Sequence, residues 1–251
     1  MEKSVVLDEL VRMSLSLGRP EMDYVILGEG NTSAKVDDES FYIKASGAQL
    51  CRSTRETFVE VKSSKIIDLL DGPDLNDEDI KERLLAARVD KTSPRPSVET
   101  VFHAYLLTLP NVRFIGHTHP TAVNTILCSN AAEDIVKSRI FPDEIVYCGL
   151  APLFIPYVDP GLPLARGIRF EVQKYMDTEG EVPKVILMQN HGLIALGAGA
   201  SDVEAITAMW VKTARILTGA YLLSGIHPLS QDSIDRIHTR PDEEYRRRMN
   251  T

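Results

Sequence analysis

Two histidines separated by one residue, His117 and His119, are the side chains of this sequence best suited to chemistry. They come after the mostly apolar residues 112–115 and Gly116, and Pro120 follows His119 at once, so a strand is predicted to stop at the histidines. Residues i and i+2 of an extended backbone point to the same face. Both imidazoles can therefore converge on one point, which is the geometry that a metal ion requires.

His191 is the candidate third ligand. It follows the apolar residues 185–188 and precedes Gly192, so it also lies where a predicted strand ends. On its own, such a residue is more often a buried structural histidine. Three neutral imidazoles together suit zinc with an open fourth position. The remaining histidines are not interpreted as ligands. His103 is interpreted as a structural residue within a helix, and His227 and His238 as surface residues.

The H-x-H pair also occurs in unrelated metal sites, and two hydrogen-bonded surface histidines would show the same spacing. Metallo-β-lactamase-type hydrolases continue with Asp and His, which residues 120–123 lack. Amidohydrolase barrels need eight strand–helix repeats, for which this chain is too short and wrongly ordered.

Glu99 is the candidate acid/base group. It lies in the first turn of a helix that Pro96 and Ser97 are predicted to begin. A carboxylate there stabilises the helix dipole, and that role alone would account for it. It could equally move a proton, or hold the metal when no substrate is bound. The spacing does not choose between these roles.

Two loops of small residues, 28–33 and 45–48, complete the candidate site. The glycine spacing of the first superficially resembles a dinucleotide fingerprint, but that motif must open a helix. Here the strand-like residues 34–36 follow, which argues against NAD. Backbone N–H groups of such loops can bind an anion, with Ser97 at a helix N-terminus as a companion. Simple turn formation is the alternative.

The hydrophobic pattern predicts a three-layer α/β domain with a mixed or antiparallel sheet. Helices are expected over residues 7–17, 98–109, 121–128, 164–176 and 201–224, the last with Ser201 and Glu204 as a capping box. Strands are expected over residues 23–27, 34–36, 41–44, 58–61, 144–147, 153–157, 185–188 and 193–196. Residues 62–93 are interpreted as a helical, solvated excursion.

The composition is that of an ordinary globular protein. We expect residues 1–251 to form a single domain with a polar C-terminal tail at about 228–251. A net charge of −8 argues against nucleic acid or membrane as a partner, and no apolar run approaches a membrane span. The three cysteines, an odd number without a C-x-x-C pair, are expected to be core residues of a cytoplasmic protein.

Five motifs, in this order, resemble the class II aldolase/adducin family from about residue 5 to residue 225. They are Gly30-Asn31-Thr32-Ser33, Ser46-Gly47, Pro96-Ser97-Val98-Glu99, His117-Thr118-His119-Pro120 and Asn190-His191-Gly192-Leu193-Ile194. Residues 27–33 also look like the aldolase-like module of some aldolase–dehydrogenase fusions. The resemblance implies an α/β/α sandwich with a mixed, largely antiparallel central sheet.

The resemblance also implies a site and a reaction. His117, His119 and His191 match the ligands of Zn2+ or another divalent metal such as Mn2+ or Co2+, and Glu99 matches the catalytic acid/base. The substrate phosphate would be held by Asn31, Ser46, Gly47 and Ser97. A homotetramer with sites between subunits is implied too. The reaction would be retro-aldol cleavage of a small carbohydrate, or decarboxylation, dehydration or 4-epimerisation through the same enolate.

Two departures from the family pattern bear on the substrate. Related sugar-phosphate aldolases carry two serines before the glutamate, whereas here the second is Val98. Their proton-donating tyrosine has no clear counterpart in residues 140–143. A non-catalytic scaffold, as in adducin, is a further alternative, but such modules have typically lost the histidines that this chain retains.

Overall fold

A computed structural model describes residues 2–241 and contains one sheet of seven strands, in the order β3-β2-β1-β4-β7-β6-β5. The strands are β1 (Asn31–Lys35), β2 (Ser40–Lys44), β3 (Phe58–Lys62), β4 (Phe114–Thr118), β5 (Leu153–Ile155), β6 (Val185–Met188) and β7 (Gly192–Gly197). Only β5 and β6 pair in parallel, and the other neighbours are antiparallel. The predicted mixed, largely antiparallel sheet is confirmed.

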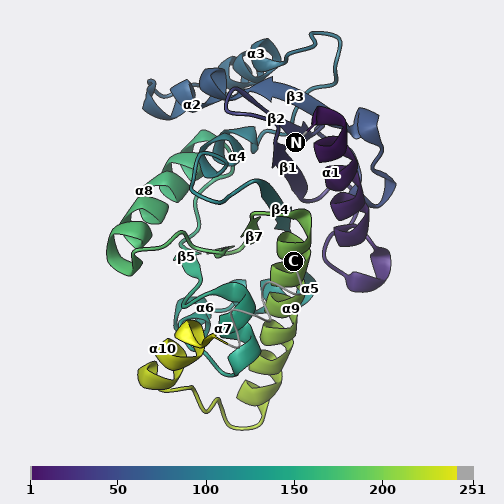
Figure 1. The fold of residues 1–251 in the computed structure, drawn as a ribbon. Coiled ribbons are helices and arrows are strands. Elements are labelled where there is room, and N and C mark those ends of the chain that lie inside the picture. The colour runs from purple at the N-terminus through teal and green to yellow at the C-terminus, as the bar shows by residue number, and fades with distance from the viewer. Residues whose placement is uncertain (1, 242–251) are drawn as a thin grey trace.

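Helices cover both faces of the sheet, which makes the architecture an α/β/α sandwich (Figure 1). One face carries α2 (Ser63–Asp71), α3 (Asp77–Ala87), α4 (Thr100–Leu106) and α8 (Leu162–Glu179). The other carries α1 (Lys3–Leu17), α5 (Thr121–Leu127), α6 (Ala132–Val136), α7 (Pro142–Cys148) and α9 (Ala200–Leu222), with α10 (Gln231–Thr239) packed on α7. Short 3-10 turns span Pro20–Met22, Leu50–Arg52 and Arg55–Thr57.

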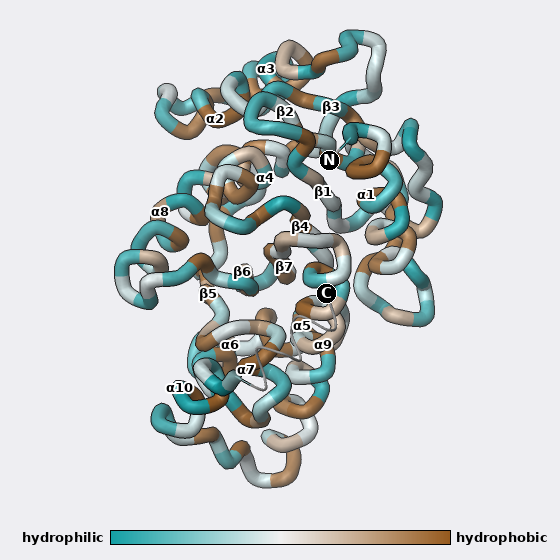
Figure 2. The backbone as a smooth tube through the Cα atoms, viewed as in Figure 1, coloured by the Kyte–Doolittle hydropathy of each residue, from teal (hydrophilic) through white to brown (hydrophobic). Residues whose placement is uncertain are grey.

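Two hydrophobic cores follow from the alternation of side chains along the central strands. In β4, Phe114 packs on the α1/α9 side and Ile115 on the α4/α8 side, and both are at most 1% exposed. In β6, Leu187 and Ile186 divide between the two cores in the same way. Because both faces are covered, β6 consists of apolar residues alone, whereas β4 changes from apolar to polar at His117. Figure 2 colours the backbone by hydropathy.

Antiparallel pairing places the candidate residues at one end of the sheet. The end of β4 lies beside the beginnings of β1 and β7, since each neighbour runs the other way. Asn31 is therefore the register partner of His117, and Thr118 is paired with Leu193, two residues after His191. Segments that are far apart in the sequence therefore meet at this end of the sheet.

Two predicted strands are wrong. Residues 23–27 form a loop, because Asp23 and Leu27 adopt left-handed backbone angles (φ 56° and 51°) that end an extended run. Residues 144–147 belong to helix α7, which begins with Pro142 and has acidic residues in its first turn. Glu144 is buried there and accepts hydrogen bonds from Arg139 and from the backbone N–H of Ile140.

Three further interpretations need correction. Helix α9 is capped by Asp202, whose carboxylate accepts from the Gly199 N–H at 3.0 Å, while Glu204 accepts from Ser16 on α1. The region 62–93 does not lie wholly in solvent, because apolar side chains of α2 and α3 belong to the α4/α8 core. Of the three cysteines only Cys148 is buried, and the other two are exposed.

The structure describes only part of the predicted polar C-terminal tail, about residues 228–251. Helix α10 lies within it and buries Ile234, whereas residues 242–251 lie outside the described residues. Within residues 2–241, none of the helices combines the length and apolarity that crossing a lipid bilayer would demand.

Candidate metal and acid–base site

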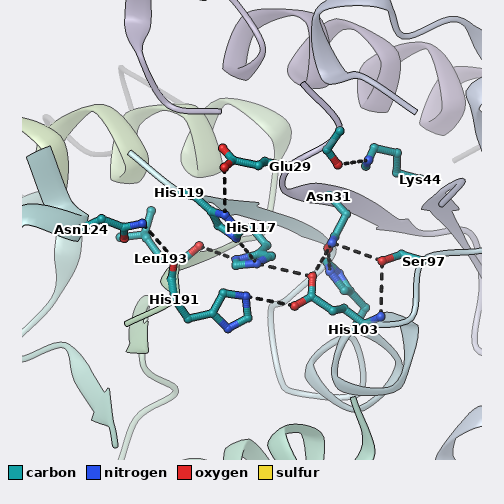
Figure 3. A network of polar contacts seen from close by, with 12 residues as sticks. Glu29, Asn31, Lys44, Ser97, His103, His117, His119, Asn124, His191 and Leu193 are labelled. Carbon is teal, nitrogen blue, oxygen red and sulfur yellow. Dashed lines mark hydrogen bonds and ion pairs between the residues drawn. The ribbon is translucent and has the colours of Figure 1, made fainter. Parts of the chain in front are cut away.

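Three imidazoles meet at the end of β4, as Figure 3 shows. The Nε2 atoms of His117 and His119 are 2.9 Å apart, and the His191 ring centroid lies 4.9 Å and 5.1 Å from theirs. One nitrogen from each histidine lies within 4.8 Å of the other two. The structure therefore brings together the three predicted ligands.

Close backbone approach makes this convergence possible. His191 occupies the tight turn between β6 and β7, in which Asn190 adopts a left-handed backbone conformation (φ 54°). Gly192 follows, and a Cβ there would lie 2.6 Å from the Thr118 carbonyl oxygen and 2.7 Å from His119 Cδ2. Only glycine leaves the two histidine-bearing segments this close.

A hydrogen bond to His117 and the burial of His117 and His119 leave imidazole lone pairs available to a cation. His117 Nδ1 lies 3.0 Å from the Leu193 carbonyl, which can only accept, so Nδ1 carries the proton and Nε2 presents its lone pair. Burial lowers the pKa of His117, and it lowers that of His119 to about 3, so both imidazoles stay neutral. His191 Nδ1 is buried without a partner among the described residues. This set of donors fits a divalent metal such as zinc.

The carboxylate of Glu99 lies against the three histidines. Its Oε1 is 3.2 Å from His191 Nε2, and its Oε2 is 3.4 Å from His117 Nε2 and 2.6 Å from the amide nitrogen of Asn31. Burial alone would raise the pKa of Glu99, but these neighbours outweigh burial and hold the pKa well below its usual value. The group is therefore an ionised carboxylate at neutral pH, 8% exposed and able to accept a proton.

The segment that carries Glu99 is fixed to the end of β2. The Ser46 N–H donates to the Arg95 carbonyl and the Ser97 N–H to the Lys44 carbonyl, at 2.8 and 3.1 Å. Ser97 Oγ in turn accepts from the Glu99 N–H at 3.3 Å. The predicted helix starts later than expected, at Thr100, and Glu99 is its N-cap residue.

The predicted anion-binding residues divide into a buried and an exposed group. Asn31 and Ser97 are buried beside Glu99, and the Asn31 amide donates to Ser97 Oγ at 3.3 Å. Ser46 and Gly47 lie on an exposed loop, where Ser46 Oγ accepts from the Arg95 guanidinium at 3.0 Å. Val98, which stands where the related aldolases have a serine, is 49% exposed.

Lys44 is a functional candidate that the sequence analysis missed. Its ammonium donates to the carbonyl of Gly28 at 3.2 Å and to that of Ala48 at 2.5 Å, so it ties together the two small-residue loops. The side chain is 2% exposed, and burial lowers its pKa to about 8. A lysine in an otherwise apolar strand, directly before a Ser-Gly loop, was the available signal.

His103 and Glu29 were also missed. His103 is structural in the sense that it is fully buried, but it hydrogen-bonds Asn31 and Ser33 within the site. Its position four residues after Glu99 in a helix could have shown that both side chains share one face.

Glu29 Oε1 lies 4.0 Å from His119 Nδ1, at the edge of a cavity of about 290 Å³ that His119 also lines. A larger cleft of about 560 Å³, at the opposite end of the sheet, contains none of these residues.

The family relationship is decided by a match to the model of the class II aldolase and adducin N-terminal domain, over residues 8–218. The chain belongs to this family. Class II aldolase/adducin enzymes depend on a divalent metal, and the histidine triad described above could hold one.

Curated relatives within the family differ in activity. A methylthioribulose-1-phosphate dehydratase from Microcystis aeruginosa is 34% identical over 80% of this chain and 90% of its own length. A 3-oxo-tetronate 4-phosphate decarboxylase from Haemophilus influenzae is 24% identical over 81% and 84%. The uncharacterized oxidoreductase YuxG from Bacillus subtilis is 30% identical over 68% of this chain, which spans 23% of that protein's length.

Solved structures of the family confirm the fold. An L-fuculose 1-phosphate aldolase superposes with a TM-score of 0.70 at 18% identity, covering 98% of both chains. YgbL from Klebsiella pneumoniae, described as a putative aldolase/epimerase/decarboxylase, gives a TM-score of 0.71 at 18% identity, covering 94% of this chain and 99% of its own.

Proposed function

We propose that the protein is a metal-dependent lyase that cleaves a small hydroxy-ketone, a sugar or sugar phosphate, by a retro-aldol reaction. The observation that carries this proposal is the ionised carboxylate of Glu99, which is buried against three converging imidazoles. The acid/base group lies at the cation site itself, which suits proton transfer to and from a substrate bound there. Metallohydrolases also place a glutamate base beside the metal, so the choice of a lyase rests on the family relationship.

In this proposal His117, His119 and His191 would hold the ion, with Glu99 as a further ligand in the absence of substrate. A divalent ion there would supply Lewis-acid stabilisation to a carbonyl oxygen and its adjacent hydroxyl. Glu99 takes up the proton that the substrate hydroxyl loses as the carbon–carbon bond breaks. The electron pair of that bond passes into the enediolate, and Glu99 then returns the proton to its carbon.

The distal part of the substrate is assigned to the two small-residue loops. Asn31 and Ser97 provide buried polar groups next to Glu99, while Ser46 and Gly47 face solvent nearby. The cations of Lys44 and Arg95 lie at the same loops, which favours an anionic substrate group.

Dehydration or decarboxylation is the second candidate, because the dehydratase and decarboxylase relatives match most of this chain. Both reactions, like 4-epimerisation, would use the same base and cation site. A product screen that separates aldol fragments, CO₂ and a dehydrated ketone distinguishes them. It should include each sugar phosphate alongside its unphosphorylated ketose and aldonate.

Replacement of Glu99 tests the proposal directly. Glu99→Gln should retain about one metal ion per chain and lose at least about 100-fold in turnover, because the amide cannot accept the proton. His119→Ala is the complementary variant and should lose the metal. A metal-free protein purified without chelators would instead favour an adducin-like scaffold, and normal turnover by Glu99→Gln would remove the role assigned here.

Assembly and location stay proposals. We infer a homotetramer from the family relationship, which light scattering of the purified chain can test, and a cytoplasmic location, which fractionation can test.

A further inference from the structure

A line of buried polar side chains leads from the candidate base into the protein interior. Asn31 Nδ2 donates to Glu99 Oε2 at 2.6 Å, and the Asn31 carbonyl oxygen contacts His103 Nε2. His103 Nδ1 lies 2.7 Å from the hydroxyl of Ser33. All four side chains are at most 8% exposed, so water does not compete for these hydrogen bonds.

The proton positions in this line are determined by what each group can do. An ionised carboxylate only accepts, so Asn31 must present its NH₂ group to Glu99 and its carbonyl oxygen to His103. That oxygen also only accepts, so His103 must carry its proton on Nε2. Burial lowers the pKa of His103 to about 3, which keeps the ring neutral, and Nδ1 therefore accepts from the Ser33 hydroxyl.

Glu99 and Ser97 accept from the NH₂ end of the Asn31 amide, and among the described side chains His103 holds its oxygen end. A half-turn of the amide would place its oxygen against Glu99 Oε2, and two acceptors would then repel each other. Glu99 is the N-cap residue of α4 and His103 follows it by four residues within that helix, so one short segment carries the base and the group that orients its partner.

We propose that His103 is a positioning residue, which fixes the Asn31 amide and thereby holds Glu99 Oε2, leaving Oε1 directed at His191 and the cation site. This inference rests on the proposed function only for the role of Glu99. It assigns to His103 a part in the reaction that its burial inside a helix did not suggest.

Two substitutions distinguish a positioning role of His103 from one in which its side chain only fills space. In His103→Gln the amide nitrogen reaches the place of Nε2 and can still donate to Asn31. In His103→Asn the shorter side chain reaches only the place of Nδ1, so it keeps the Ser33 contact and loses the Asn31 contact. Thermal unfolding of both variants establishes that they are folded.

Three readouts apply. In the unsubstituted protein, ¹⁵N NMR of labelled histidine should show His103 as the Nε2–H tautomer. With Co²⁺ bound, His103→Asn should change the visible absorption spectrum, because the Glu99 carboxylate shifts near the ion, while His103→Gln should preserve it. With a substrate from the screen, His103→Asn should lower kcat by about 10–100-fold at nearly constant KM, and His103→Gln should restore most of it.

An Nδ1–H tautomer would overturn the inference, and so would equal Co²⁺ spectra for the Gln and Asn variants. The first two readouts need no substrate, and the NMR measurement needs no variant. A failure of the proposed lyase activity is therefore distinguishable from a failure of the role assigned to His103.

Discussion

Replacement of Lys44 by methionine should show that its buried ammonium lowers the free energy of unfolding. The side chain is 2% exposed, and its ammonium is held by the carbonyl oxygens of Gly28 and Ala48 rather than by a carboxylate. Burial lowers its pKa from 10.5 to about 8. The folded protein therefore binds this proton more weakly than the unfolded chain does.

The size and sign of the effect follow from this difference. A pKa of about 8 in the folded state against 10.5 in the unfolded state corresponds to about 3 kcal/mol of destabilisation at low pH. Between these two values the unfolded chain binds more protons, so the free energy of unfolding rises with pH. From pH 7 to pH 10, the parent protein should gain about 2 kcal/mol relative to Lys44→Met.

Urea unfolding followed by the fluorescence of the single tryptophan, buried Trp210, measures this difference. Both proteins should be compared with metal removed, so that metal binding does not add its own pH dependence. Lys62→Met, an exposed lysine on the neighbouring strand β3, is the matched control and should show a constant difference from the parent. Parallel stability curves for the parent and Lys44→Met from pH 7 to pH 10 would refute the reasoning.

Three further substitutions or measurements test other parts of the structure. Gly192→Ala should lower metal affinity at least about tenfold, because the new Cβ would displace the ring of His119. Competition with a chelator measures the affinity, and an unchanged value would contradict the close approach of Gly192 to His119. Glu144→Leu should lower the free energy of unfolding by about 3–5 kcal/mol in urea, because it leaves the buried guanidinium of Arg139 unpaired. A thiol reagent should modify two cysteines in the native protein and Cys148 only after unfolding, because burial removes its access and raises the pKa of its thiol.

The site was predicted from sequence where its residues lie at the ends of strongly apolar strands. His117, His119 and His191 each follow such a run, and a strand end is where a side chain can face a ligand while its backbone stays in the sheet. The family resemblance added Glu99, whose local pattern also fitted a helix-dipole role. Whether residues 1–251 form a single domain stays a prediction.

What could not be predicted depends on contacts between distant segments. His103 and Lys44 have ordinary local surroundings, a helix interior and the end of a strand, and only the fold shows that their polar atoms reach the site. The prediction of a strand at 144–147 failed for a local reason. Its apolar residues suit a strand, but Pro142 begins a helix there and Glu144 pairs with Arg139, five residues earlier, in the interior.

The site is best understood as one connected network rather than as a set of separate ligands. A line of buried side chains, each contacting the next, runs from Ser33 through His103 and Asn31 to Glu99 and His191. In such a place an unpaired group costs about 1–3 kcal/mol. The network therefore restricts each side chain to the orientation that satisfies its neighbour, and it orders the carboxylate of Glu99. Preorganisation of this kind explains why a protein would keep so many polar groups in the interior of a sheet.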